Sequence, residues 1–131
     1  MSARHAPREE RGSTTTEAVL VTPALLFLVM LVVQFGLWFH AQHVAQAAVE
    51  EGSRAARAER GTAAAGRDRT NAFLDQAGPT ILVDRQVTAG RTAEAVTITV
   101  EGRSRPVVPG FSLPIRAVAS SPVERFRSDN G

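Results

Sequence analysis

The stretch AVLVTPALLFLVMLVVQFGLWF, residues 18–39, decides the fold of this chain, because it holds 22 consecutive residues without a formally charged side chain. As an α-helix it would extend about 33 Å, close to the roughly 30 Å hydrocarbon thickness of a bilayer. A helix that is apolar on every side needs a cover on every side, and the rest of the chain is too short to supply one. The sequence therefore predicts one transmembrane helix over residues 18–39.

The arginines that flank the span predict its orientation. Arg4, Arg8 and Arg11 precede it, whereas the next arginine after it is Arg54. Basic residues concentrate in the cytoplasmic segments next to a membrane span. We therefore expect a single-pass protein of the cell membrane, with a cytoplasmic N-terminus and an extracytoplasmic C-terminal part.

Composition argues against several classes of function. All 15 basic residues are arginines scattered among acidic residues, with a net charge of only +2 and without the concentrated basic face of a nucleic-acid-binding protein. The chain has no cysteine, which excludes disulfides and thiolate metal sites. His40 and His43 lie one helical turn apart with Glu50 as the nearest further ligand, but no metal-binding motif supports a site. No phosphate-binding loop or nucleophile elbow occurs, so we expect no enzyme, cofactor, metal or small-molecule substrate.

The residues directly before the span form the candidate site. Glu17 places a carboxylate at the membrane edge, which is costly unless the group is solvated, paired or used. The positive end of the helix dipole favours an anion there. A purely structural interpretation is also available, because residues 14–17 fit a capping box with Thr14 as N-cap and Glu17 at the third helical position.

A short polar, basic leader that ends in Gly12, with Glu17 fifth after it and an apolar helix beyond, resembles the N-terminal signal of type IV prepilins and pseudopilins. The resemblance implies that a prepilin peptidase cuts between Gly12 and Ser13. It also implies that Glu17 docks the subunit by pairing with the new amino group of a neighbour, and such a pair attracts strongly in low dielectric. Ser13 departs from the apolar or aromatic first residue of many major pilins, which puts N-methylation in doubt.

The order of several further motifs is similar to that of the TadE-like family. The match comprises Arg11-Gly12-Ser13, Glu17-Ala18, Thr22-Pro23-Ala24-Leu25-Leu26, Gln34-Phe35-Gly36 and the segment AAVEEGSRAA at residues 47–56. This resemblance implies a non-enzymatic minor pseudopilin of a Tad (Flp-type) pilus or a related secretion apparatus. Its implied partners are the lipid bilayer, other pilin-like subunits, pilus assembly platform proteins and the prepilin peptidase.

Two features of the long helix add predictions. Pro23 cannot donate a hydrogen bond to the carbonyl of Val19, so we expect a helix kink there. Beyond the bilayer the helix should continue to Gly61, because residues 40–60 contain no proline and are rich in good helix formers. Small residues recur along one face of this part, which either allows close helix packing or reflects abundant alanine: Ala41, Ala45, Ala48, Gly52 and Ala56.

The C-terminal part predicts a small outer domain. Residues 62–77 read as a short helix with Phe73 and Leu74 as its apolar contacts, ended by Gly78. Strands are expected at 81–87, 94–101 and 113–120, with Val96, Ile98 and Val100 on one face of the second. The fold class is thus α+β and pilin-like, a long N-terminal helix on an antiparallel sheet of about three strands.

We divide the chain into a cytoplasmic leader at 1–12, a transmembrane and extended helix at 13–61, an outer α+β domain at 62–124 and a flexible tail at 125–131. Two alternatives to the pseudopilin remain. The chain could be an unprocessed bitopic envelope scaffold or adaptor. It could instead be a secreted soluble domain released near Ala47, because residues 45–47 have the small-x-small form that signal peptidase accepts.

Overall fold

One long helix organises the structure, a computed structural model that describes residues 9–58 and 60–123. Helix α1, Glu9–Arg57, is 49 residues long and includes Pro23 in its interior. It begins five residues before Thr14, so the expectation that Thr14 caps the helix is wrong for the chain with its leader. Residues 1–8 of the predicted leader and the predicted tail at 125–131 lie outside the described residues.

Helix α2, Ala63–Ala77, begins and ends with capping interactions. Thr62 is the N-cap, and its hydroxyl oxygen accepts a hydrogen bond from the Ala65 N–H at 3.0 Å. Gly78 follows at φ 138°, a backbone conformation that glycine tolerates best, and its N–H donates to the Leu74 carbonyl at 3.1 Å. The expected second helix is therefore present; it begins one residue later than expected, with Thr62 as its N-cap, and ends at Ala77 as expected.

Three antiparallel strands form one sheet in the order β1-β2-β3: β1 Leu82–Arg91, β2 Ala95–Ser104 and β3 Pro114–Pro122. β1 is longer than expected, because residues 88–91, which we expected to form the turn, pair with β2 as far as Arg91 opposite Val96. The turn shrinks to residues 92–94, where the Thr92 hydroxyl oxygen accepts hydrogen bonds from the N–H groups of Glu94 and Ala95. β1 also carries an irregularity between Val83 and Gln86, where Asp84 has φ 53°.

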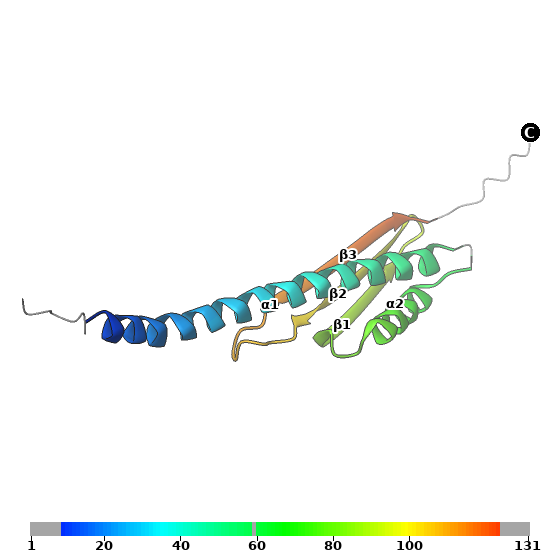
Figure 1. The fold of residues 1–131 in the computed structure, drawn as a ribbon. Coiled ribbons are helices and arrows are strands. Elements are labelled where there is room, and N and C mark those ends of the chain that lie inside the picture. The colour runs from blue at the N-terminus through cyan, green and yellow to red at the C-terminus, as the bar shows by residue number, and fades with distance from the viewer. Residues whose placement is uncertain (1–8, 59, 124–131) are drawn as a thin grey trace, which may run out of the picture.

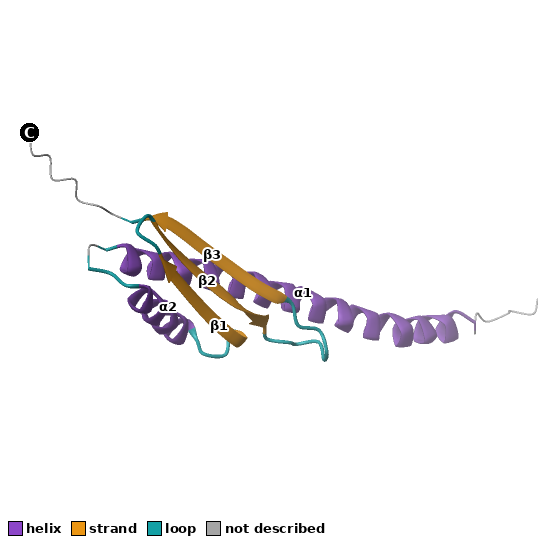
Figure 2. Cartoon of the chain, turned by 180° about the vertical axis from the view of Figure 1, so that it is seen from behind, coloured by secondary structure: helices purple, strands orange, loops and turns teal. Residues whose placement is uncertain are grey.

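The hydrophobic core lies between one face of the sheet and the two helices. Val96, Ile98 and Val100 of β2 are each 0% exposed, which confirms the face that their alternation predicts. The C-terminal half of α1 covers β2 and β3, and α2 lies beside it over β1 (Figures 1 and 2). The fold is therefore the expected α+β arrangement. The structure differs at the end of α1, which stops at Arg57; a turn in which the Gly61 N–H donates to the Ala58 carbonyl follows.

Candidate membrane-anchoring and assembly site

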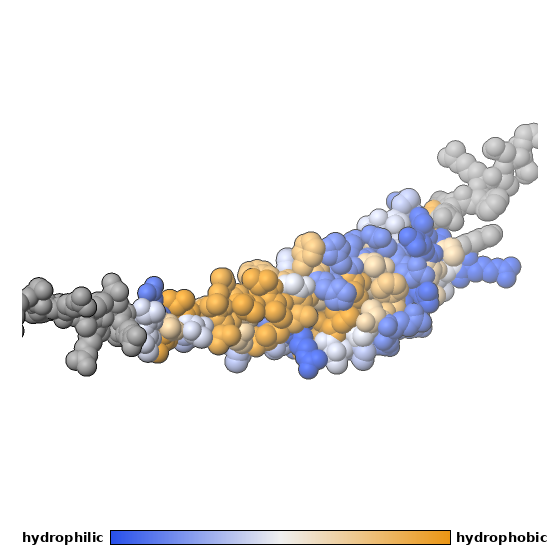
Figure 3. Space-filling model, in the orientation of Figure 1, coloured by the Kyte–Doolittle hydropathy of each residue, from blue (hydrophilic) through white to orange (hydrophobic). Residues whose placement is uncertain are grey.

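The N-terminal half of α1 projects beyond the other described elements, and its side chains from Thr14 to Val29 are exposed (Figure 1). Its surface is almost wholly apolar, in contrast to the polar surface around the sheet (Figure 3). Large apolar side chains there are exposed all round the helix, from Leu20 at 70% to Val33 at 46%. Fully burying one such side chain stabilises a protein by about 1.5–3 kcal/mol, so about ten partly exposed ones amount to on the order of 10 kcal/mol. That is comparable to the stability of a whole domain, which means that this half of α1 requires lipid or protein around it.

The predicted processing and docking residues lie at the start of this bare segment. The backbone of Gly12 and Ser13 is helical, within the first turns of α1, and Glu17 follows one turn later with its side chain exposed. Among the residues whose side chains the structure describes, the hydrogen bonds between α1 and the outer domain begin at Gln34, so Glu17 lies apart from that domain. Any partner for the Glu17 carboxylate in an assembly therefore has to come from lipid, water or another chain.

Pro23 lies inside the bare segment, and α1 continues through it as one helix. Proline lacks an N–H, so the Val19 carbonyl has no donor from that position of the helix. In a membrane helix a neighbouring hydroxyl can supply the missing donor, and Thr22 is adjacent in sequence. The kink remains a prediction.

Gln34 is the point at which the bare and the covered parts of α1 meet. Its side chain is 0% exposed, and both the oxygen and the nitrogen of its amide group make hydrogen bonds. The oxygen accepts from the N–H groups of Val107 at 2.6 Å and Val108 at 3.3 Å. The nitrogen donates to the Arg105 carbonyl at 3.2 Å and to the Ser104 hydroxyl at 3.4 Å. One glutamine inside the predicted span therefore holds the loop at residues 105–113, which we call the β2–β3 loop.

Two further donors continue this row at intervals of four residues along α1. The Trp38 indole N–H donates to the Pro114 carbonyl at 3.0 Å, and the Gln42 side chain donates to the Arg116 carbonyl at 2.7 Å. Residues four apart lie on one helix face, so Gln34, Trp38 and Gln42 form a ladder of donors that runs from the end of β2 and the β2–β3 loop onto β3. This ladder was not predicted from the sequence, although the four-residue spacing of the hydrogen-bond donors at 34, 38 and 42 indicates one polar helix face.

The small residues of α1 face the inside of this chain. Ala41, Ala45, Ala48 and Ala56 are at most 1% exposed and belong to the core. Gly52 faces α2: a Cβ added there would collide with the Thr70 hydroxyl and lie 2.7 Å from the Gly66 carbonyl oxygen. The side chains that we selected for helix packing are thus occupied by the chain's own sheet and second helix, and they are not free for a second subunit.

Charged groups of the outer domain and the aromatic His43 have partners within the chain. Arg69 of α2 donates to the Glu51 carboxylate of α1 through two nitrogens, at 3.0 and 3.1 Å, and Arg85 of β1 contacts Asp75 of α2 at 2.8 Å. Such partly exposed pairs contribute little each, about 0–1 kcal/mol. His43 packs edge-on against Phe39 with ring centroids 4.5 Å apart. Within the part of the chain that the structure describes, no group of three metal-ligating side chains occurs, including around His40 and His43.

A bare apolar half-helix joined to a small α+β domain defines a membrane-anchored, single-pass protein with one candidate membrane span. Residues 12–54 match the family model described as TadE-like protein, which confirms the resemblance found in the sequence. The match ends within α1, so α2 and the sheet lie outside it. The TadE-like match relates this chain to Tad pilus components. Comparisons with curated proteins and with solved structures found no match.

Proposed function

We propose that this protein is a non-enzymatic minor pseudopilin of a Tad (Flp-type) pilus or a related secretion apparatus. The observation that carries the proposal is the division of one continuous helix. Residues 14–33 are almost wholly apolar and are exposed except for the half-buried Met30 and Leu31, while residues from Gln34 to Arg57 are built into the outer domain. A subunit that passes from the bilayer into a polymer needs such a helix, because its bare half exchanges lipid for neighbouring helices while the outer domain stays folded.

Glu17 acts as the docking residue in this proposal. The bare segment from residue 14 to 33 extends about 30 Å as a helix, which matches the hydrocarbon core and places Glu17 just inside its edge. A carboxylate there is costly when isolated, so an ammonium group of a neighbouring subunit would both satisfy and attract it. Cleavage between Gly12 and Ser13 would supply that ammonium at the mature N-terminus. With Arg4, Arg8 and Arg11 before the span, this end faces the cytoplasm.

Cleavage at Gly12 requires the first turns of α1 to open, because the backbone there is helical. Glycine disfavours a helix by about 1 kcal/mol relative to alanine, so opening next to the helix end is inexpensive. Removal of the leader would leave Ser13 as the first residue and Thr14 to Glu17 in the first turn. The capping arrangement that the leader prevents would then become available to the mature chain.

The fold disfavours the alternative of a secreted domain released near Ala47. Such a cut would remove Gln34, Trp38 and Gln42 and with them the ladder of donors. It would also remove Ala41 and Ala45 from the core. The apolar face of the sheet would then keep only residues 48–57 of α1 and α2 as its cover, so the remainder would lose much of its stability. The unprocessed bitopic scaffold keeps the whole fold and is the alternative that an experiment has to separate.

The experiment that tests the proposal is the N-terminal sequence and intact mass of the protein purified from membranes of its own host. We expect a chain that begins at Ser13. A chain that retains the leader would contradict processing and favour the unprocessed scaffold. A chain that begins near Ala48 would contradict membrane anchoring as well.

Replacing Glu17 with glutamine should abolish most incorporation into the pilus fraction while the protein still inserts into the membrane. An ion pair at 4 Å is worth about 4 kcal/mol at an effective dielectric constant of 20, and losing a third of this reduces association about tenfold. Quantitative immunoblots of sheared pili and of membranes measure the two pools. The matched control is Glu50→Gln, which neutralises an exposed carboxylate of the same helix in the outer domain and should change neither pool. Equal incorporation of both variants would refute the docking role.

A further inference from the structure

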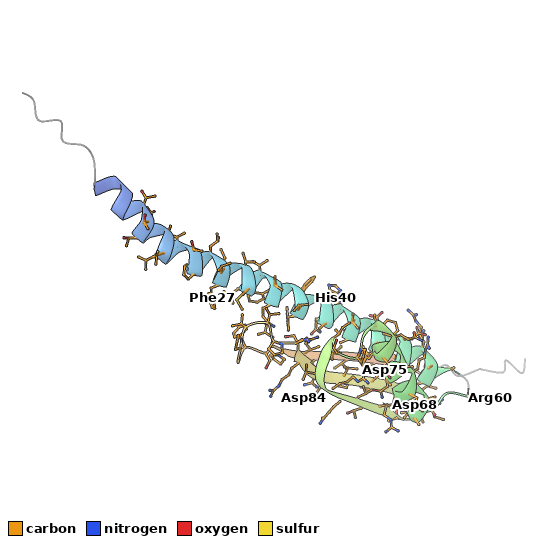
Figure 4. The ribbon with its side chains drawn as sticks, turned by 60° about the horizontal axis from the view of Figure 1, so that its bottom comes forward. Phe27, His40, Arg60, Asp68, Asp75 and Asp84 are labelled. Atoms are coloured by element: carbon orange, nitrogen blue, oxygen red, sulfur yellow. The ribbon has the colours of Figure 1, made fainter. Side chains whose placement is uncertain are left out.

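The β2–β3 loop, residues 105–113, lies beside the apolar part of α1 and not beyond its end. Gln34 holds the loop, yet Phe35, Leu37 and Phe39 continue the exposed apolar surface of α1 past that level. Figure 4 shows the side chains of the loop gathered next to α1 between the positions of Phe27 and His40. Residues 34–39 extend about 9 Å along the helix axis, slightly more than the roughly 5–8 Å depth of one headgroup region. If the hydrocarbon core covers residues 14–33, the part of the loop that Gln34 holds lies at the height of the headgroups, and the rest of the loop approaches the hydrocarbon.

The composition of the loop suits that height. Residues 106–115 contain no formal charge, and the tip presents Pro109, Gly110 and Phe111, of which Phe111 is 40% exposed. Membrane-surface segments bury apolar side chains such as Phe and Leu where hydrocarbon meets headgroups. An exposed aromatic ring at the tip of an uncharged loop, next to a membrane span, has the chemistry of a lipid contact.

Several backbone N–H groups of the loop also have hydrogen-bond partners within the chain, as a segment near the bilayer requires. Irregular backbone is tolerated near the bilayer only when its polar groups have partners within the protein. The Gln34 amide oxygen accepts from two N–H groups of the loop, and two other N–H groups are bound to the Val108 carbonyl and the Ser104 hydroxyl. Two positions are prolines and have no N–H to satisfy. The residues concerned are Val107, Val108, Phe111 and Leu113, with Pro106 and Pro109.

Basic groups stand at the base of the same loop. Arg103 and Arg105 are exposed on the side of the loop toward the sheet. Arg105 and His40 also line a pocket whose other walls include Leu37 and Ile81. Arginine at a membrane boundary extends its stem along apolar surface and places its guanidinium among lipid phosphates. The two arginines thus lie at the expected height of the headgroups, while the uncharged tip of the loop extends toward the apolar half of α1 (Figure 1).

We propose that the β2–β3 loop is a lipid-contacting element, which inserts its tip at Phe111 into the headgroup region on the sheet side of the bilayer and thereby fixes the depth of α1. The inference depends on α1 spanning the bilayer and does not depend on Glu17 docking or on cleavage at Gly12. Gln34 is then the residue that sets the distance between the hydrocarbon core and the sheet.

The test uses the full chain, which has no native cysteine, carrying one introduced cysteine and a nitroxide spin label. Phe111→Cys is the test position, Phe27→Cys the lipid control on the bare helix, and Ala64→Cys the water control on the exposed side of α2. The proteins are reconstituted at low density into vesicles of phosphatidylcholine and phosphatidylglycerol. Power saturation compares collisions with lipid-soluble oxygen and with a water-soluble nickel chelate.

We expect the label at 111 to favour oxygen over the nickel chelate, less strongly than the label at 27 and opposite to the label at 64. A label at 111 that behaves like the label at 64 would overturn the proposal. Protection from both reagents would overturn it too, because the tip would then be buried against a second copy. A label at 27 that is accessible to nickel would show that α1 does not span the bilayer, a failure distinct from that of the pilus role.

Discussion

Replacing Gly52 with valine is expected to lower the unfolding midpoint of the outer domain by more than about 10 °C. A Cβ at this position would collide with the Thr70 hydroxyl and lie 2.7 Å from the Gly66 carbonyl oxygen. Either the helices move apart or the buried Thr70 hydroxyl gives up its 2.8 Å hydrogen bond to that carbonyl. Overpacking costs about 1–3 kcal/mol and a lost buried hydrogen bond about as much, and each kcal/mol shifts the midpoint of a small domain by about 4–8 °C.

The measurement is thermal unfolding of the full chain in detergent micelles, followed by the fluorescence of Trp38. This is the only tryptophan of the chain, and it reports directly on the contact between α1 and β3. The control is the same substitution at Gly36, on the same helix, where an added Cβ would meet nothing within 4 Å. If both valine variants unfold at the wild-type temperature, the close approach of α1 and α2 is not what Gly52 provides.

Replacing Gln34 with leucine is expected to free the β2–β3 loop while leaving α1 in the membrane. Leucine has a similar size and favours lipid, so the span itself gains apolar character. The loop loses the amide oxygen that binds Val107 N–H at 2.6 Å, together with the donor to the Arg105 carbonyl. Each buried polar group left without a partner costs about 1–3 kcal/mol, so amide exchange at Val107 should accelerate by about a hundredfold.

Hydrogen exchange followed by mass spectrometry, on peptides that include residues 104–113, measures this effect. Gln46→Leu is the control, since Gln46 is exposed on the same helix and donates a hydrogen bond to Glu50, away from the loop. It should leave the loop as protected as in the wild type. Unchanged protection in the Gln34 variant would mean that the loop is held by something other than this amide.

Much of the fold could be predicted from the sequence because its patterns are strong and local. Val96, Ile98 and Val100 alternate, and alternation alone assigns the buried face of β2. Thr62 and Gly78 mark the ends of α2 by cap chemistry that operates within a few residues. The turn between β1 and β2 was misplaced, because residues 88–91 join the sheet through pairing with β2, a non-local interaction that short-range propensity does not reveal.

The candidate site was predicted less completely. A run without charges identifies a span, but hydropathy cannot distinguish a glutamine that faces lipid from one that holds a loop some 70 residues later, as Gln34 does. The small residues of α1 posed the same difficulty, because a stripe suited to close packing does not say which partner packs there. The structure shows that Gly52 meets α2 of the same chain. Glu17, in contrast, is exposed on α1, and its proposed role rests on the resemblance to prepilins.

Trp38 and Gln42 of this ladder also affect whether a strand from another molecule can pair with β3. β3 is an edge strand, and a bare edge invites a further strand from another molecule. Here side chains of α1 already engage the outward carbonyls of Pro114 and Arg116, so a fourth strand would first have to break those hydrogen bonds. Addition of a strand at this end of β3 is therefore unfavourable, because both of these carbonyls are already hydrogen-bonded within the chain.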